Sequence, residues 1–309
     1  MFNSNKRITK KLNSVINELN SLHTKGNLEK MLQASILSQF NISNTANILN
    51  NIQLAEFKVF SQWKDDGIIQ FLVDYLTPDN KTFIEFGVEN YTESNTRFLL
   101  MNNNWTGLIL DGTEGNIKDV QQQEIYWQYN LTAATAFITA ENINDLIEQH
   151  GFSGETGLLH IDIDGNDYWV WKAISVISPI IVIVEYNSVF GEKNSWTIPY
   201  KPDFNRTDAH YSNLYFGSSL LSLYDLAKEK GYTFIGSNSN GNNAYFIRND
   251  KMQGLKPTTV KEGYVRSQFR ESRDRNGNLN YLSGEYRLKE INGMEVYNTR
   301  TKNLEKIIS

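Results

Sequence analysis

The chain has 309 residues, 40% of them hydrophobic and 21% charged, and its net charge of −5 corresponds to a pI of about 5.5. Such a composition is typical of a soluble globule, and the acidic balance argues against a nucleic-acid partner held through phosphate contacts. The absence of cysteine excludes disulfides, thiolate metal sites and cysteine nucleophiles. No apolar run is long enough to cross a bilayer, and the polar first residues do not resemble a secretory signal, so we expect a cytoplasmic protein.

Residues 7–50 predict a polar helical extension, because apolar side chains recur there at helical spacing. The clearest stripe consists of Ile8, Leu12, Val15, Ile16 and Leu19. A stripe this narrow usually packs on a partner helix or on the domain body. A homo-oligomer formed through these helices is therefore one expected arrangement.

The remainder of the chain predicts an α/β fold. A helix at 55–76 is stopped by Thr77-Pro78-Asp79. Further helices are expected at 93–101, 143–150, 168–174 and 218–230. Strands are expected at 82–86, 106–110, 134–139, 157–163, 180–185, 232–236 and 243–247. Short alternating strands and helices of this kind build a doubly wound parallel sheet, and the turn between the last two strands predicts a hairpin.

Two consecutive strand ends indicate a nucleoside-type cofactor. The first strand ends near Glu85 and Gly87, where glycine lets a ligand approach the backbone and the following helix offers free N–H donors. The next strand ends in Asp111-Gly112, and a carboxylate there suits a ribose diol. The first signal is not a GxGxxG motif, and a turn used only for tight packing is the alternative.

An acidic cluster follows the strand at 157–163. Asp162, Asp164 and Asp167 surround Gly165 at the carboxyl edge of the sheet, where ligands bind in open α/β folds. Because carboxylates lose solvation when they are brought together there, the cluster needs a cation, hydrogen-bond donors or a substrate. A solvated turn with a helix-capping aspartate is the simpler alternative.

Glu185 and Asn187 close the next apolar strand. If the two strands are neighbours, these side chains meet Asp162 and Asp164, and such oxygen ligands suit Mg²⁺ or the hydroxyls of a sugar. A set of hydrogen-bonded strand-end caps without metal is the alternative.

Histidine is scarce, with four residues in the chain. His210 lies in a loop that could fold over the sheet edge, and it is the best candidate for a general base near neutral pH. His23 is expected at the surface, His150 at a helix end, and His160 in the core.

Taken together, these motifs resemble the class I S-adenosylmethionine-dependent methyltransferases of the FkbM type. The likeness covers about residues 57–248. The segments that carry it are Glu85-x-Gly87, Asp111, Ile161–Tyr168, Ser61–Ile69, Gly217–Leu220, Gly231-Tyr232 and Asn243–Phe246. Only Gly87 remains of the usual glycine-rich loop. Asp164 stands where these enzymes usually have glutamate. In this respect the chain is more similar to Mg²⁺-dependent macrocin-type O-methyltransferases.

The resemblance implies a seven-stranded Rossmann-like sheet with its last strand antiparallel, and S-adenosylmethionine as cofactor. The implied cofactor-binding residues are Glu85, Gly87, Asn90, Ser94, Asn95, Asp111, Gly112, Ala140, Glu141 and Asp162. Catalysis is assigned to Asp162, Asp164, Glu185 and His210. A tentative Mg²⁺ site uses Asp164, Glu185 and Asn187.

The expected function is therefore O-methylation of a sugar or glycan precursor, in surface-polysaccharide or natural-product biosynthesis. A helical extension at 1–54 would precede a methyltransferase domain at 55–250, with an extension at 251–309 packing on the core. Two alternatives are a glycosyltransferase that holds a metal and nucleotide-sugar on Asp162-Ile-Asp164, and a non-catalytic binding subunit with a degenerate pocket.

Overall fold

The computed structural model describes residues 2–308, except for the side chains of residues 2–10, 12, 13, 16, 17, 19–21 and 23. Four members of the predicted N-terminal stripe, and His23, therefore lie outside the described side chains. Val15 is exposed.

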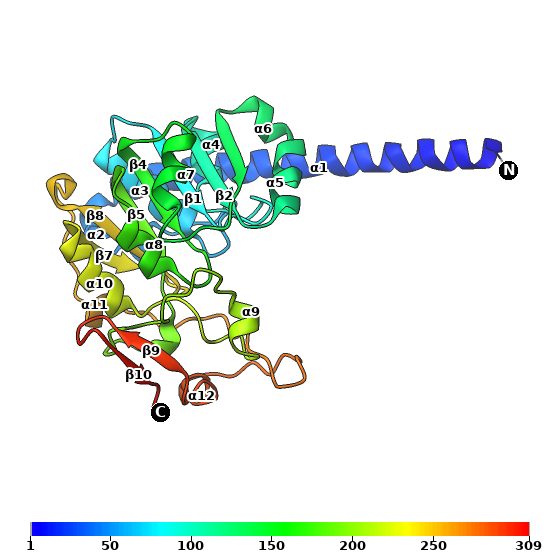
Figure 1. The fold of residues 1–309 in the computed structure, drawn as a ribbon. Coiled ribbons are helices and arrows are strands. Elements are labelled where there is room, and N and C mark those ends of the chain that lie inside the picture. Colours follow the sequence, from blue (N-terminus) through cyan, green and yellow to red (C-terminus); the bar gives the residue numbers. More distant parts are fainter. Residues whose placement is uncertain (1, 309) are drawn as a thin grey trace.

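Seven strands form one mainly parallel sheet in the order β3-β2-β1-β4-β5-β8-β7 (Figure 1). The strands are β1 (Thr82–Phe86), β2 (Thr106–Asp111), β3 (Leu131–Thr135), β4 (Gly154–Ile161), β5 (Ile177–Glu185), β7 (Tyr232–Ser237) and β8 (Asn243–Arg248). β8 runs antiparallel to both β5 and β7. The predicted Rossmann-like α/β fold, with its last strand antiparallel and a terminal hairpin, is confirmed.

Helices cover both faces of this sheet. One face packs against α3 (Asp65–Leu76), α4 (Arg97–Asn103) and α5 (Glu114–Gln122). The other face packs against α7 (Ile143–Gln149), α8 (Asp167–Ala173) and α10 (Leu220–Glu229). The central strands are consequently buried on both sides, which explains the continuous apolar run of residues 180–184.

The segment after β5 and the C-terminal part together build a second, smaller layer with its own core. β6 (Trp196–Thr197), β9 (Glu295–Asn298) and β10 (Asn303–Lys306) form a three-stranded antiparallel sheet, which the sequence did not predict. With α12 (Glu285–Glu290) nearby, this sheet lies at the bottom of Figure 1. Its core consists of Phe190, Ile198, Leu214, Tyr215, Ile291, Val296 and Ile307.

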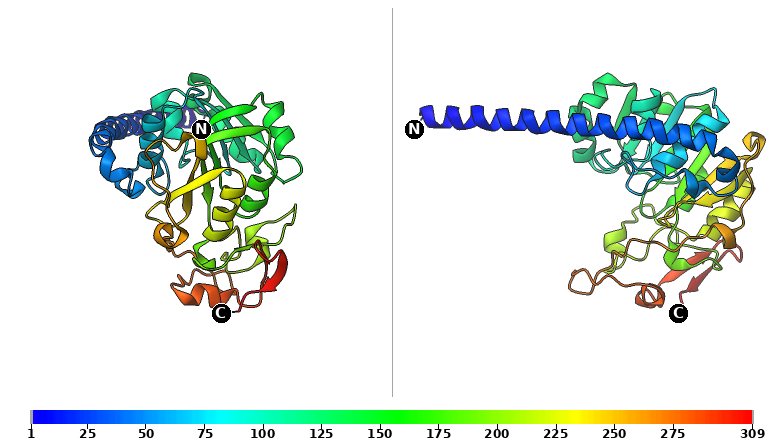
Figure 2. Two further views of the ribbon diagram at one scale, coloured as in Figure 1. Left: turned by 90° about the vertical axis from the view of Figure 1, so that its left-hand side faces the viewer. Right: turned by 180° about the vertical axis from the view of Figure 1, so that it is seen from behind.

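The first helix, α1 (Phe2–Ser43), is one continuous helix that projects far beyond the body (Figures 1 and 2). Near its C-terminal end, Met31 and Ala34 pack against a cluster that includes Phe57 and Phe98. None of the helices in the described residues 2–308 is both long and apolar enough to cross a membrane.

Buried carboxylates move two helix starts away from their predicted positions. The helix predicted at 55–76 begins only at Asp65, because one oxygen of Asp66 accepts the N–H groups of residues 59, 60 and 61 at 2.7–2.9 Å. The helix predicted at 93–101 begins at Arg97, because Glu85 accepts the N–H groups of the two residues before it.

Other boundaries also differ from the predictions. The strand predicted at 134–139 is β3 at 131–135, so residues 136–139 lie outside the sheet. The helices α5 and α6 (Glu124–Gln128) were not predicted. Further short helical segments are α2 (Thr45–Ile48), η1 (Ile52–Ala55), η2 (Ser188–Phe190), α9 (Arg206–Ala209), η3 (Asn249–Lys251) and α11 (Val260–Gly263).

Candidate active site

A cavity of about 650 Å³ lies at the carboxyl ends of β1, β2, β4 and β5. The strand order reverses between β1 and β4, and in open α/β sheets such a reversal opens a crevice for ligands. Most of the residues predicted from the sequence line this cavity: Glu85, Gly87, Asn90, Ser94, Asn95, Asp111, Gly112, Asp162, Asp164 and Glu185.

Gly87 forms the tight junction between β1 and β4. Its φ angle is +73°, and a Cβ atom at this position would lie 1.6 Å from the carbonyl oxygen of Asp162. Its N–H donates to the carbonyl of Leu110 on β2 at 3.0 Å. Because only glycine fits between the two chain segments, Gly87 brings the ends of three strands together.

Asp111 is held at the tip of β2 by three donors. The N–H groups of Glu89 and Thr113 each donate to it at 2.8 Å, and the amide of Asn116 donates at 3.1 Å. Within the described residues, its Oδ2 atom accepts only the bond from Glu89 and keeps acceptor capacity for a hydroxyl. The carboxylate is therefore oriented before any ligand arrives.

Glu85 and His160 form a buried pair at the back of the cavity. Glu85 accepts from the N–H groups of Asn95 and Thr96 at 2.9 and 3.1 Å, from the Thr96 hydroxyl, and from Nδ1 of His160 at 3.0 Å. Burial opposes ionisation of Glu85, but the hydrogen bond and charge of His160 outweigh it and lower the pKa of Glu85. Burial likewise opposes protonation of His160, whereas Glu85 raises the pKa of His160 above its usual value.

His160 was expected in the core, and it is buried as predicted, but it also lines the cavity. The signal that could have revealed this is its position two residues before Asp162. Residues i and i+2 of an extended chain point to the same side. Glu85, in turn, orders the cavity wall and has little capacity left for a ligand.

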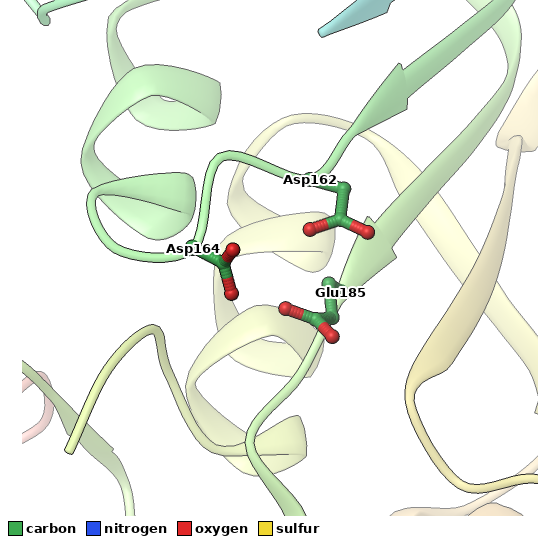
Figure 3. Close-up of side chains that lie close together, drawn as sticks. All are labelled: Asp162, Asp164 and Glu185. Carbon is green, nitrogen blue, oxygen red and sulfur yellow. The ribbon is translucent and has the colours of Figure 1, made fainter. Parts of the chain in front are cut away.

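Three carboxylates converge at the carboxyl ends of β4 and β5, and we call them the acid triad: Asp162, Asp164 and Glu185. Their nearest oxygen atoms all lie within 4.8 Å of one another. Figure 3 shows Asp162 and Glu185 at the ends of two neighbouring strands, with Asp164 on the loop that follows the first. Burial, reinforced by the neighbouring carboxylates, raises the pKa of both Asp162 and Glu185.

Arg206 supplies the counter-charge to the acid triad, and the sequence did not identify it. Its Nη1 atom forms an ion pair with Asp164, and its Nε atom donates to the carbonyl of Asn213 at 2.9 Å. The guanidinium lies 3.8 Å from the centre of the Phe216 ring. Its Nη2 atom is buried and has no hydrogen-bond partner among the described residues. The loop predicted to fold over the sheet edge thus delivers an arginine to the cavity.

Two predicted residues have other tasks. Asn187 does not line the cavity: its amide donates to the carbonyls of Leu214 and Phe216, and its Oδ1 accepts the N–H of Val189. Because these bonds anchor the loop after β5, the structure contradicts its assignment as a metal ligand. His210 bonds to Ser212 at 2.7 Å and also lies outside the cavity lining, so it is not placed to act as the general base.

Ala140 and Glu141 also lie outside the cavity lining. The N–H of Ala140 donates to the hydroxyl of Tyr200, which itself donates to Glu141. Because β3 ends early, the cavity is lined by Phe137 and Ile138 and not by residues 140 and 141, which had been predicted to contact the adenine of the cofactor.

Asp167 belongs to the turn rather than to the acid triad. Its carboxylate accepts the N–H groups of Ile163 and Gly165 at 2.8 and 3.0 Å. Burial raises its pKa to about 6. The capping explanation therefore applies to Asp167, but not to Asp162 and Asp164.

No family model and no curated protein matches the chain. Among solved structures, it is similar to the N-terminal domain of EvdMO1 with SAH bound, at 11% identity and a TM-score of 0.41, over 68% of this chain and 94% of that one. It is also similar to an O-methyltransferase from Bacillus cereus in complex with SAH, at 16% identity and a TM-score of 0.39, over 69% and 89% of the two chains. An S-adenosylmethionine-dependent methyltransferase from Clostridium acetobutylicum shows 10% identity and a TM-score of 0.40, over 67% and 98%.

Proposed function

We propose that the protein is an S-adenosylmethionine-dependent O-methyltransferase. One observation carries the proposal: the carboxyl ends of four strands meet in a single cavity, with Asp111 at the end of β2, Gly87 after β1, and the acid triad at the ends of β4 and β5. A cofactor that extends from β2 to β4 would place its methyl group beside the acids.

The proposed cofactor position follows from the wall of the cavity. Asp111 would accept hydrogen bonds from the ribose hydroxyls, and Phe137 and Ile138 would cover the adenine. Because Gly87 has no side chain, the methionine part of the cofactor would have room to lie close to the backbone there.

The acid triad would hold the acceptor. In methyl transfer, the acceptor oxygen attacks the sulfonium methyl group, the carbon–oxygen bond forms, the carbon–sulfur bond breaks and S-adenosylhomocysteine leaves. The hydroxyl proton must be accepted by a nearby base. Asp162 is the best placed group, because burial and its carboxylate neighbours raise its pKa to about 7.

A sugar is the acceptor class that this end of the cavity favours. Trp63, Phe204 and Phe269 line the cavity together with the acid triad, and Trp63 stacks on Phe269 with ring centres 5.9 Å apart. Flat aromatic rings pack against the apolar faces of sugars, while carboxylates accept the hydroxyl hydrogens.

Cofactor binding provides the first test. We expect S-adenosylhomocysteine to bind in isothermal titration and Asp111→Asn to weaken binding about 10- to 100-fold, because one charged acceptor is lost. Asp119→Asn, an exposed change on α5, is the matched control and should have no effect. Absence of binding at millimolar ligand would contradict the proposal. Thermal protection by a nucleoside diphosphate with Mn²⁺ instead would indicate a glycosyltransferase.

The acid triad also fits a Mg²⁺ ion, since it offers three carboxylates at close range. When bound, such an ion would supply positive charge that stabilises the acceptor alkoxide. Arg206 already occupies part of this role through its ion pair with Asp164. The chain therefore contains two candidate sources of positive charge for the same carboxylates.

We predict that Arg206→Gln strengthens Mn²⁺ binding, because the competing guanidinium is removed. Binding should also strengthen as the pH rises through about 7, since Asp162 must lose its proton to coordinate a cation. Calorimetric titration of wild type, Arg206→Gln and Asp164→Asn measures both effects. Equal affinity in all three proteins would contradict a metal site on the acid triad.

We further propose that α1 mediates self-association. The docked end of α1, where Met31 and Ala34 pack on the body, also exposes large apolar side chains, and Leu32, Ile36 and Phe40 are 59–67% exposed. A second copy of this chain would cover them through its own α1. We expect light scattering to show a dimer or larger assembly that Leu32→Glu with Ile36→Glu disrupts. The control pair, Leu304→Glu with Ile308→Glu, changes two exposed apolar residues elsewhere. A wild-type monomer would refute the assignment.

A further inference from the structure

A second cavity, of about 600 Å³, lies in the C-terminal layer. Its walls come from η2, the segment 264–270 and α12. Segment 266–271 separates it from the candidate active site: Phe269 and Glu271 line the first cavity, whereas Gln268 and Arg270 line the second.

The lining of this second cavity is strongly basic. Arg266, Arg270, Arg287 and Lys289 face a single acid, Glu285. Within residues 2–308, none of these four cations forms an ion pair with a carboxylate. Since the chain as a whole carries a net charge of −5, this local excess of positive charge is not a general property of its surface.

Arg287 differs from the other three cations of this cavity because it is buried, with only 5% of its surface exposed. Its Nη1 atom donates to the carbonyl of Phe269 at 2.9 Å, and the guanidinium lies 5.5 Å from the centre of that residue's ring. Its Nε atom is buried and finds no hydrogen-bond partner in the part of the chain that the structure describes. A buried guanidinium without a carboxylate in ion-pair contact is unfavourable, and burial lowers the pKa of Arg287 to about 10 although the charge of Glu271 opposes this shift.

We propose that this second cavity binds a small organic phosphate. A phosphate would supply the negative charge that Arg287 lacks, and arginines match the paired oxygens of phosphate with parallel hydrogen bonds. The exposed Arg266 and Arg270 would close over it from the loop. Val189, Phe190 and Leu288 form an apolar wall that would contact the carbon skeleton of the ligand.

The site is independent of the proposed methyl transfer, but it touches the same loop. A ligand bound to Arg287 would affect the hydrogen bond from Arg287 to the carbonyl of Phe269, and the ring of Phe269 lines the first cavity. An organic phosphate could thus be sensed by the candidate active site through one loop.

Titration of the full chain with glucose 1-phosphate and with inorganic phosphate tests the proposal. We expect glucose 1-phosphate to bind at least 10-fold more tightly than inorganic phosphate, because only the former reaches the apolar wall. Arg266→Gln with Arg270→Gln should weaken binding at least 10-fold, and Arg287→Met should abolish it. Both changes of the double variant are exposed, so the fold should persist, as thermal unfolding would show.

The matched control is Lys256→Gln with Lys306→Gln, which removes two exposed positive charges outside the cavity. Its affinity for glucose 1-phosphate should equal that of wild type. Equal weakening by the control pair would show general charge attraction and overturn the site. Equal affinity for the two phosphates, or no binding at 10 mM of either, would also overturn it.

Discussion

Replacement of Gly87 by alanine is expected to abolish binding of S-adenosylhomocysteine and to destabilise the protein by about 3 kcal/mol or more. The new Cβ atom would lie 1.6 Å from the carbonyl oxygen of Asp162, so β1 and β4 would have to separate at the floor of the cavity. Urea unfolding and calorimetric titration measure the two effects.

Gly151 provides a matched control for this substitution. Its φ angle is +81°, close to the +73° of Gly87, but no atom lies within 4 Å of a Cβ built on it. Gly151→Ala therefore carries the backbone strain without the clash and should cost about 1 kcal/mol, with cofactor binding intact. If the two variants unfold at the same urea concentration, the junction between β1 and β4 does not require glycine.

The second large effect is expected for Asp162→Asn. If Asp162 accepts the proton of the acceptor hydroxyl, the amide should lower the rate of methyl transfer by about 10²- to 10⁴-fold while S-adenosylhomocysteine still binds. Release of S-adenosylhomocysteine, measured with an acceptor found by screening sugar phosphates and nucleotide sugars, reports the rate. Asp145→Asn, an exposed change on α7, is the control.

The stability of Asp162→Asn should move in the opposite direction to its activity. Removal of one carboxylate relieves repulsion from Asp164 and Glu185, which contributes to the raised pKa of Asp162. If Asp162→Asn unfolds at a higher temperature than wild type but has lost activity, the Asp162 carboxylate serves function at the expense of stability. Activity within about 3-fold of wild type would remove Asp162 from the proposed chemistry.

The convergence of the candidate site could be predicted because parallel strands place their carboxyl ends at one edge. Gly87, Asp111, Asp162 and Glu185 each follow or end an apolar strand, and all four line the same cavity. Site residues that were predicted from the expected end of a strand were placed less accurately. Ala140 and Glu141 missed the cavity because β3 ends three or four residues earlier than its apolar pattern suggested.

Side chains that act through distant contacts could not be found in this way. Arg206 reaches the acid triad from a loop without periodicity, and it is held there by Phe216 and the carbonyl of Asn213. Asn187 has the right chemistry for a metal ligand, but its amide nitrogen and its amide oxygen are both hydrogen-bonded to the backbone of the same loop. Nothing in the local sequence distinguishes these uses.

By itself, the sequence determined the doubly wound sheet and the edge at which its acids gather. Strands buried on two faces are recognised from continuous apolar runs, and the acids are recognised from their positions at the ends of those runs. Only the tertiary structure decided which carboxylates remain free for a ligand. Glu85 is occupied by His160 and Asp167 by its own turn, whereas Asp162, Asp164 and Glu185 meet across two strands. The physical reason is that hydrogen-bond partners brought from distant segments, rather than residue type, determine how much acceptor capacity a carboxylate has left.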